Sequence, residues 1–135
     1  MIDEIPVYVL ECNLPISIMG GYCKNASKLS EKIIEKFDIV HITSWYYHPA
    51  IVFAKSAYKN KIPFIISSYA TLHPENRNIK KFLKLIYDTF YTNKLIKKAS
   101  GMHSVGRLET KAYMEFGVKS KNIFQINPPI LRENF

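Results

Sequence analysis

The sequence predicts an α/β fold, a three-layer, Rossmann-like and doubly wound parallel sheet of about five strands. Short apolar runs without in/out alternation recur along the chain, which is typical of strands buried on both faces. They occupy residues 5–11, 38–43, 63–67, 102–105 and 122–126. Helical patterns separate the runs, and strand–helix alternation favours parallel strands joined by right-handed crossovers. A length of 135 residues fits one domain over 1–135.

The first half of the chain gives three strands and two helices. Residues 5–11 are a strand in which Pro6 is tolerable near the start. A loop with Gly20-Gly21 follows, and residues 25–37 show apolar side chains at helical spacings. After the strand at 38–43, Pro49 suits the first position of a helix that ends near residue 60. The third strand then begins at residue 63.

The second half contains the longest helical pattern, residues 77–98, followed by two more strands. Its apolar stripe has a strongly basic exterior. The stripe comprises Ile79, Phe82, Leu83, Ile86, Phe90 and Leu95, and the exterior Lys80, Lys81, Lys84, Lys94, Lys97 and Lys98. A helix at 107–116 stops at Gly117, the usual C-terminal residue, and Pro128-Pro129 ends the last strand.

The charge points to an anionic partner. A net charge of +8 and a pI near 9.5 favour nucleic acid, anionic lipid headgroups or phosphorylated small molecules. The sequence has no apolar run long enough to span a bilayer and no secretory signal, so the default expectation is the cytoplasm. Nucleic acid is the least favoured partner, because no nucleic-acid motif accompanies the charge.

The cysteines and histidines do not predict a metal site. Cys12 and Cys23 lack zinc-ligand spacing, and we expect them to be free or buried thiols rather than a disulfide. The histidines show no HxxxH or HExxH spacing. GxGxxG and GxSxG are also absent, so neither a dinucleotide site nor a serine-hydrolase elbow is predicted.

Polar and aromatic side chains follow two neighbouring predicted strands, where ligands of open α/β sheets bind. They are Ser44, Trp45 and Tyr46 after one strand, and Ser67, Ser68 and Tyr69 after the next. The alternative roles are packing for the aromatic residues and loop capping for the serines. His41 is either a core residue or part of a site. Glu109 is either a helix-start carboxylate or a site residue.

Five segments together resemble the acceptor-side, N-terminal domain of the family 4 glycosyltransferases, retaining enzymes of the two-domain GT-B fold. Residues 38–42, DIVHI, look like the family's D-[IV]-V-H-x-H strand. IPF at 62–64 and SSYATLHP at 67–74 resemble G-[IV]-P and S-P-H-G-M-L-D-P. KASGMHS at 98–104 resembles R-A-D-A-[IV]-H-A, and IFQINPPI at 123–130 is similar to a strand that ends in I-P-N-G-[IV].

The resemblance implies a protein that binds a sugar or lipid-linked acceptor through Ser44, Trp45, Tyr46, Ser67, Ser68 and Tyr69, with support from His41 and Glu109. Lipid-linked acceptors also fit an anionic membrane surface beside Lys80, Lys81 and Lys84, at the inner face of the membrane. The sequence departs from the family where Tyr69-Ala70 replaces His-Gly, so the catalytic residues stay unassigned.

The family's donor domain, with its Glu-x7-Glu signature, would follow the last strand, but this sequence ends at Phe135. We therefore expect no nucleotide-sugar site in this chain and no transfer by it alone, unless a separate donor domain completes the enzyme. The family's first strand–helix unit is likewise expected to be absent. The alternative is a stand-alone basic α/β module that binds a membrane surface, a protein or nucleic acid.

Overall fold

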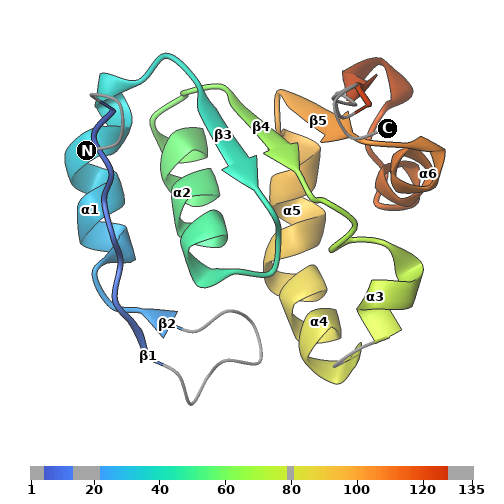
Figure 1. Cartoon of the computed structure of the whole chain (residues 1–135), viewed down its shortest axis with the longest axis horizontal. Coiled ribbons are helices and arrows are strands. Elements are labelled where there is room, and N and C mark those ends of the chain that lie inside the picture. Colours follow the sequence, from blue (N-terminus) through green and yellow to red (C-terminus); the bar gives the residue numbers. More distant parts are fainter. Residues whose placement is uncertain (1–4, 14–21, 79–80, 128–135) are drawn as a thin grey trace, which may run out of the picture.

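The computed structural model describes residues 5–13, 22–78 and 81–127 and shows a mixed α/β protein. Four strands form a parallel sheet in the order β3-β4-β5-β6 (Figure 1). Their bounds are β3 (Val40–Thr43), β4 (Phe64–Ser67), β5 (Gly101–Ser104) and β6 (Ile123–Gln125). The strands predicted at these places are confirmed.

The α-helices are α1 (Ala26–Ile33), α2 (His48–Lys59), α3 (Pro74–Asn78), α4 (Lys81–Tyr87), α5 (Asn93–Leu95) and α6 (Arg107–Glu115). The helices predicted before residue 61 and after residue 106 are confirmed, whereas the single helix predicted over 77–98 is divided into shorter helical segments. Shorter turns are 3-10 at Ile34–Lys36, Ile96–Lys98 and Ser120–Asn122, and π-helical at Asp88–Thr92. Gly117 follows α6 with φ of 81°, the left-handed conformation that ends helices. No helix in the described ranges is long and apolar enough to cross a membrane.

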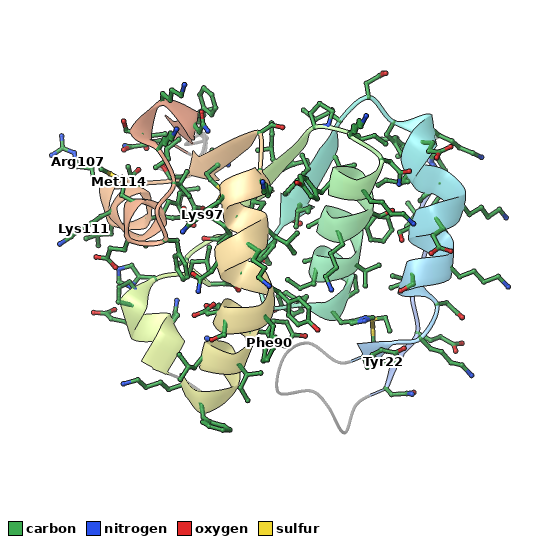
Figure 2. All side chains as sticks on the ribbon, turned by 180° about the vertical axis from the view of Figure 1, so that it is seen from behind. Tyr22, Phe90, Lys97, Arg107, Lys111 and Met114 are labelled. Carbon is green, nitrogen blue, oxygen red and sulfur yellow. A yellow bond between two sulfur atoms is a disulfide. The ribbon has the colours of Figure 1, made fainter. Side chains whose placement is uncertain are left out.

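The sheet is covered by helices on one face. Its strands are neighbours in the order of the sequence, and right-handed crossovers that always advance in one direction all lie on the same face. Figure 2 shows α2 and α5 in front of the strands, whereas in Figure 1 no described helix lies over β3 and β4. His41 and Thr43 are accordingly exposed. The expectation that this strand is buried on both faces is wrong.

The core lies between the sheet and these helices. Phe64, Ile66 and Met102 point from the strands into it, and Ile96 and Leu95 approach from the helical side. The alternate side chains of the same strands, such as His41, face the other way.

The predicted strand at residues 5–11 does not join the sheet, so the described sheet has four strands. Ile5, Val7 and Val9 are more than half exposed, and Val9 reaches 89%. The pairing near this segment is a separate antiparallel ladder, β1 (Cys12–Asn13) with β2 (Tyr22–Cys23).

Cys12 and Cys23 form a disulfide, which corrects the expectation of free thiols. The β1–β2 register places the two cysteines opposite each other, with 4.2 Å between their Cα atoms. Sequence spacing could not reveal this pairing, because a disulfide requires the two cysteines to be close in space, which spacing alone does not specify.

Candidate functional site

A row of hydrogen bonds crosses three strands near their carboxyl ends. His41 Nε2 lies 2.7 Å from Ser67 Oγ, which lies 2.8 Å from His103 Nδ1. His103 Nε2 then lies 3.0 Å from the carbonyl oxygen of Ile126. All three side chains come from the open face of the sheet, because the parallel register aligns their strands.

The direction of this row follows from its last partner. A carbonyl oxygen only accepts, so His103 Nε2 carries a hydrogen and donates to Ile126. In the neutral ring, Nδ1 then accepts from the hydroxyl of Ser67, whose oxygen accepts in turn from His41 Nε2–H. With this direction, Nδ1 of a neutral His41 ring is the remaining hydrogen-bond acceptor of the row, and His41 is exposed.

Glu109 fixes the loops that follow β4 and β5. Its carboxylate is 4% exposed and accepts from Ser68 Oγ at 2.5 Å, from the Ala70 N–H at 2.9 Å and from the Val105 N–H at 2.9 Å. Burial alone would raise the pKa of Glu109, but these hydrogen bonds outweigh it and lower the pKa below its ordinary value. Glu109 is therefore a buried carboxylate that positions the strand-end loops.

Tyr113 ties the same loop to β5. Its hydroxyl accepts from the Ser68 N–H at 3.0 Å and lies 2.9 Å from the carbonyl oxygen of His103 and 3.0 Å from Ser68 Oγ. Burial, with Glu109 nearby, raises the pKa of the Tyr113 phenol far above its ordinary value. The phenol stays protonated and holds the main chain of His103.

Several non-glycine residues at the strand ends adopt left-handed backbone conformations. The φ angles are 66° at Ser44, 62° at Tyr46, 46° at Tyr69 and 62° at Ala70. Such conformations cost roughly 1–3 kcal/mol each and gather at functional sites. They turn the Tyr69 ring out to 50% exposure, edge-on to the His103 ring with 6.3 Å between centroids.

The predicted contact residues divide into exposed and buried ones. Tyr69 is exposed, Ser44 is half-buried, and Ser67 sits in the hydrogen-bonded row. Trp45 is fully buried and donates from Nε1 to Thr92 at 3.0 Å. Tyr46 is 4% exposed and donates to the carboxylate of Asp88 at 2.9 Å.

Trp45 and Tyr46 thus pack in the core, and the Ser68 hydroxyl is also buried. These three side chains do not line an exposed cleft, so the interpretation of them as acceptor contacts is replaced by packing and loop support. The sequence left packing open as the alternative for Trp45 and Tyr46, and both side chains are buried against partners that are distant in the sequence.

A groove of about 370 Å³ runs beside β3 at the exposed end of the row. Its lining is Val40, His41, Ile42, Thr43, Ser44, Tyr47, Pro49, Ala50 and Phe53. His41, Thr43, Ser44 and Tyr47 thus border one groove, whose other lining residues are apolar. A larger hollow of about 490 Å³ lies between α1 and α2, away from the strand ends.

Sequence reasoning missed His103 and Tyr113 as parts of this region. One signal was present for His103, since it lies one residue before the end of β5 and alternates with the core residue Met102. Within the described residues, no group of three or more His, Cys, Asp or Glu side chains could hold a metal ion.

Comparison with known proteins adds no family. No protein-family model matches the chain, and the search of curated proteins returned no match. The function is therefore argued from the geometry of the strand-end site.

Proposed function

We propose that the carboxyl edge of β3 to β5 binds a sugar acceptor, and that this chain is the acceptor-side half of a retaining, nucleotide-sugar-dependent glycosyltransferase. The observation that carries this proposal is the row His41–Ser67–His103, whose exposed end residue, His41, also lines the groove. Ligands of open parallel sheets bind at this edge. The proposal keeps the function that the sequence resemblance implies and changes the residues assigned to it.

The exposed groups suit an uncharged, hydroxyl-rich ligand. His41 Nδ1 accepts a hydrogen bond from a sugar hydroxyl, while the Thr43 and Ser44 hydroxyls either donate or accept. The exposed rings of Tyr47 and Tyr69 offer apolar faces against which a pyranose ring packs. Ser67 and His103 act as positioning residues, because they fix the tautomer and orientation of His41.

The donor would be bound elsewhere. The site provides hydroxyl, imidazole and phenol groups, and a nucleotide sugar would need a second domain, either linked to this one or separately encoded. Transfer requires donor and acceptor to be held together in a reactive geometry. This half therefore binds the acceptor without transferring a sugar to it.

The test is an NMR titration of the protein with free hexoses and N-acetylhexosamines, read at the histidine and tyrosine side chains. Binding shifts the signals of His41, Tyr47 and Tyr69 and leaves those of Tyr58 unchanged. His41→Ala abolishes the shifts, whereas the matched control His73→Ala does not.

Two results would contradict the proposal. Unchanged spectra at saturating concentrations of every sugar, or shifts that persist in His41→Ala, would remove the acceptor site. Turnover of a labelled nucleotide sugar by the isolated chain would instead refute the claim that a second domain is needed.

A further inference from the structure

The helix α4 and the turn after it expose an apolar ridge. The exposed fractions are 73% for Phe82, 59% for Leu85, 39% for Ile86 and 62% for Phe90 (labelled in Figure 2). Their spacing of three and four residues places them on one side of the helix. The sequence pattern predicted an apolar stripe with a basic exterior here, but the ridge itself faces outward.

Polar and aromatic contacts on the opposite side explain this orientation. The buried carboxylate of Asp88 accepts from the hydroxyl of Tyr46, and Thr92 accepts from the indole of Trp45. The ring of Tyr87 lies edge-on to that of Tyr46, with 6.4 Å between centroids. Because these residues turn inward, the apolar side chains on the opposite side of the helical segment turn outward.

The charges of residues 77–98, which carry the ridge, are almost all positive, and the neighbouring helix α3 adds one exposed acidic residue, Glu75. Residues 77–98 contain seven Lys or Arg and one acidic residue, Asp88, which is 3% exposed. Lys81 precedes Phe82 and is exposed, and Lys94 and Lys97 are exposed beyond Phe90.

The three lysines predicted to contact a membrane, Lys80, Lys81 and Lys84, differ in their surroundings. Lys84 Nζ lies 5.0 Å from the centre of the Tyr46 ring and donates to the carbonyl oxygen of Asn76, so it stabilises the protein's own fold. Lys80 lies outside the described residues. Lys81 is exposed and directly precedes Phe82, and its contact with a membrane stays a prediction.

We propose that this ridge inserts into the interfacial region of an anionic membrane, with Lys81 and Lys94 beside the lipid headgroups. An exposed apolar helix face bordered by lysines is the pattern of helices that lie in the membrane interface. Anionic lipid satisfies both parts of the surface, since acyl chains take up the apolar side chains and headgroups pair with the cations. Nucleic acid would satisfy only the charges. The proposal is independent of the sugar site.

The experiment measures partitioning of the chain onto vesicles of phosphatidylcholine with and without phosphatidylglycerol, at low and high salt. We expect binding to the anionic vesicles that weakens with salt. The double variant Phe82→Ser/Phe90→Ser should bind about tenfold or more weakly. The matched control is Leu108→Ser on α6, which removes another side chain, 69% exposed, and should bind like the unaltered chain.

Charge reversal separates the electrostatic contribution to membrane binding from the apolar one. Lys81→Glu/Lys94→Glu should weaken binding to anionic vesicles and flatten its salt dependence, because both changes reduce the attraction to the headgroups. Circular dichroism of each variant establishes that it is folded.

The proposal fails if the unaltered chain ignores anionic vesicles at low salt, or if the serine variant binds as the control does. It also fails if sedimentation shows a dimer that the serine variant abolishes, because a second copy would then cover the ridge. The sugar titration of the serine variant should be unchanged, so failure of this proposal and failure of the acceptor site are distinguishable.

Discussion

Replacing Glu109 with glutamine tests the buried carboxylate that holds the strand-end loops. The change keeps the size of the side chain but replaces one acceptor oxygen with a donor. If the remaining oxygen keeps Ser68 and Ala70, the new amide group faces the N–H of Val105. An unsatisfied buried donor costs about 1–3 kcal/mol, and the other two hydrogen bonds lose their charge assistance. We therefore expect Glu109→Gln to lower the free energy of unfolding by about 2–4 kcal/mol.

The effect has a defined pH dependence. The folded pKa of Glu109 lies below its ordinary value of 4.5, because hydrogen bonds outweigh the effect of burial. A carboxyl group with a lowered folded pKa contributes stability that is fully present above the unfolded pKa and is lost as the pH falls through the folded value. Glutamine does not titrate. The difference in stability between the two proteins should therefore be largest at neutral pH and shrink below about pH 4.5.

Urea unfolding followed by circular dichroism at neutral and acid pH measures this difference. The control is Glu115→Gln, which makes the same change at an exposed position on the same helix and should stay within about 0.5 kcal/mol of the unaltered protein. The reasoning is refuted if Glu109→Gln behaves like the control, or if its deficit grows on acidification.

Three further measurements test local features of the fold. Ala70→Gly should raise the free energy of unfolding by about 0.5–1 kcal/mol, because it removes the strain of a non-glycine residue in the left-handed conformation. The control Ala50→Gly inside α2 should lower the free energy of unfolding by a similar amount. A change of the same sign in both variants would contradict this reasoning. Reduction of the disulfide between Cys12 and Cys23 should cost up to about 3 kcal/mol in thermal or urea unfolding, since it frees a loop with a sequence separation of 11. His48 Nδ1 accepts from the Cys23 N–H, and burial, with Lys55 nearby, lowers the pKa of His48. The stability that this contact contributes should therefore be present above pH 6.5 and be lost as His48 becomes protonated at lower pH. An NMR pH titration measures the pKa of His48, and a value above 6.5 would reverse the predicted sign.

The sequence was sufficient for the local elements of the fold, because each one has its own periodicity. Pro49 marks the first turn of α2, and Gly117 follows the end of α6 as predicted. The disulfide and the fate of residues 5–11 were not predictable in this way. Both depend on which segments pair across the chain, and apolar composition at 5–11 does not specify a partner strand.

The place of the candidate site was predictable from the rule that ligands bind at the carboxyl ends of parallel strands. Which side chains there are exposed and which are buried was not predictable. Parallel strands put Ser67 and His41 at one edge of the sheet wherever the helices lie. Trp45 and Tyr46 turn inward because their partners Thr92 and Asp88 arrive from 47 and 42 residues away in the sequence. The same distant contacts turn the apolar side of α4 outward. The two hydrogen bonds therefore account both for the burial of Trp45 and Tyr46 and for the exposed ridge.

The order of the strands also explains why the groove exists. A doubly wound sheet reverses direction at a switch point and places a further strand beside its starting strand. In the described ranges the order runs from β3 to β6 without reversal, so β3 is an edge strand and the groove lies along its free side. A strand added there in parallel would fill the groove that contains Thr43 and Ser44. The proposed sugar binding in this groove therefore requires β3 to remain an edge strand, and a partner that extends the sheet would compete with it.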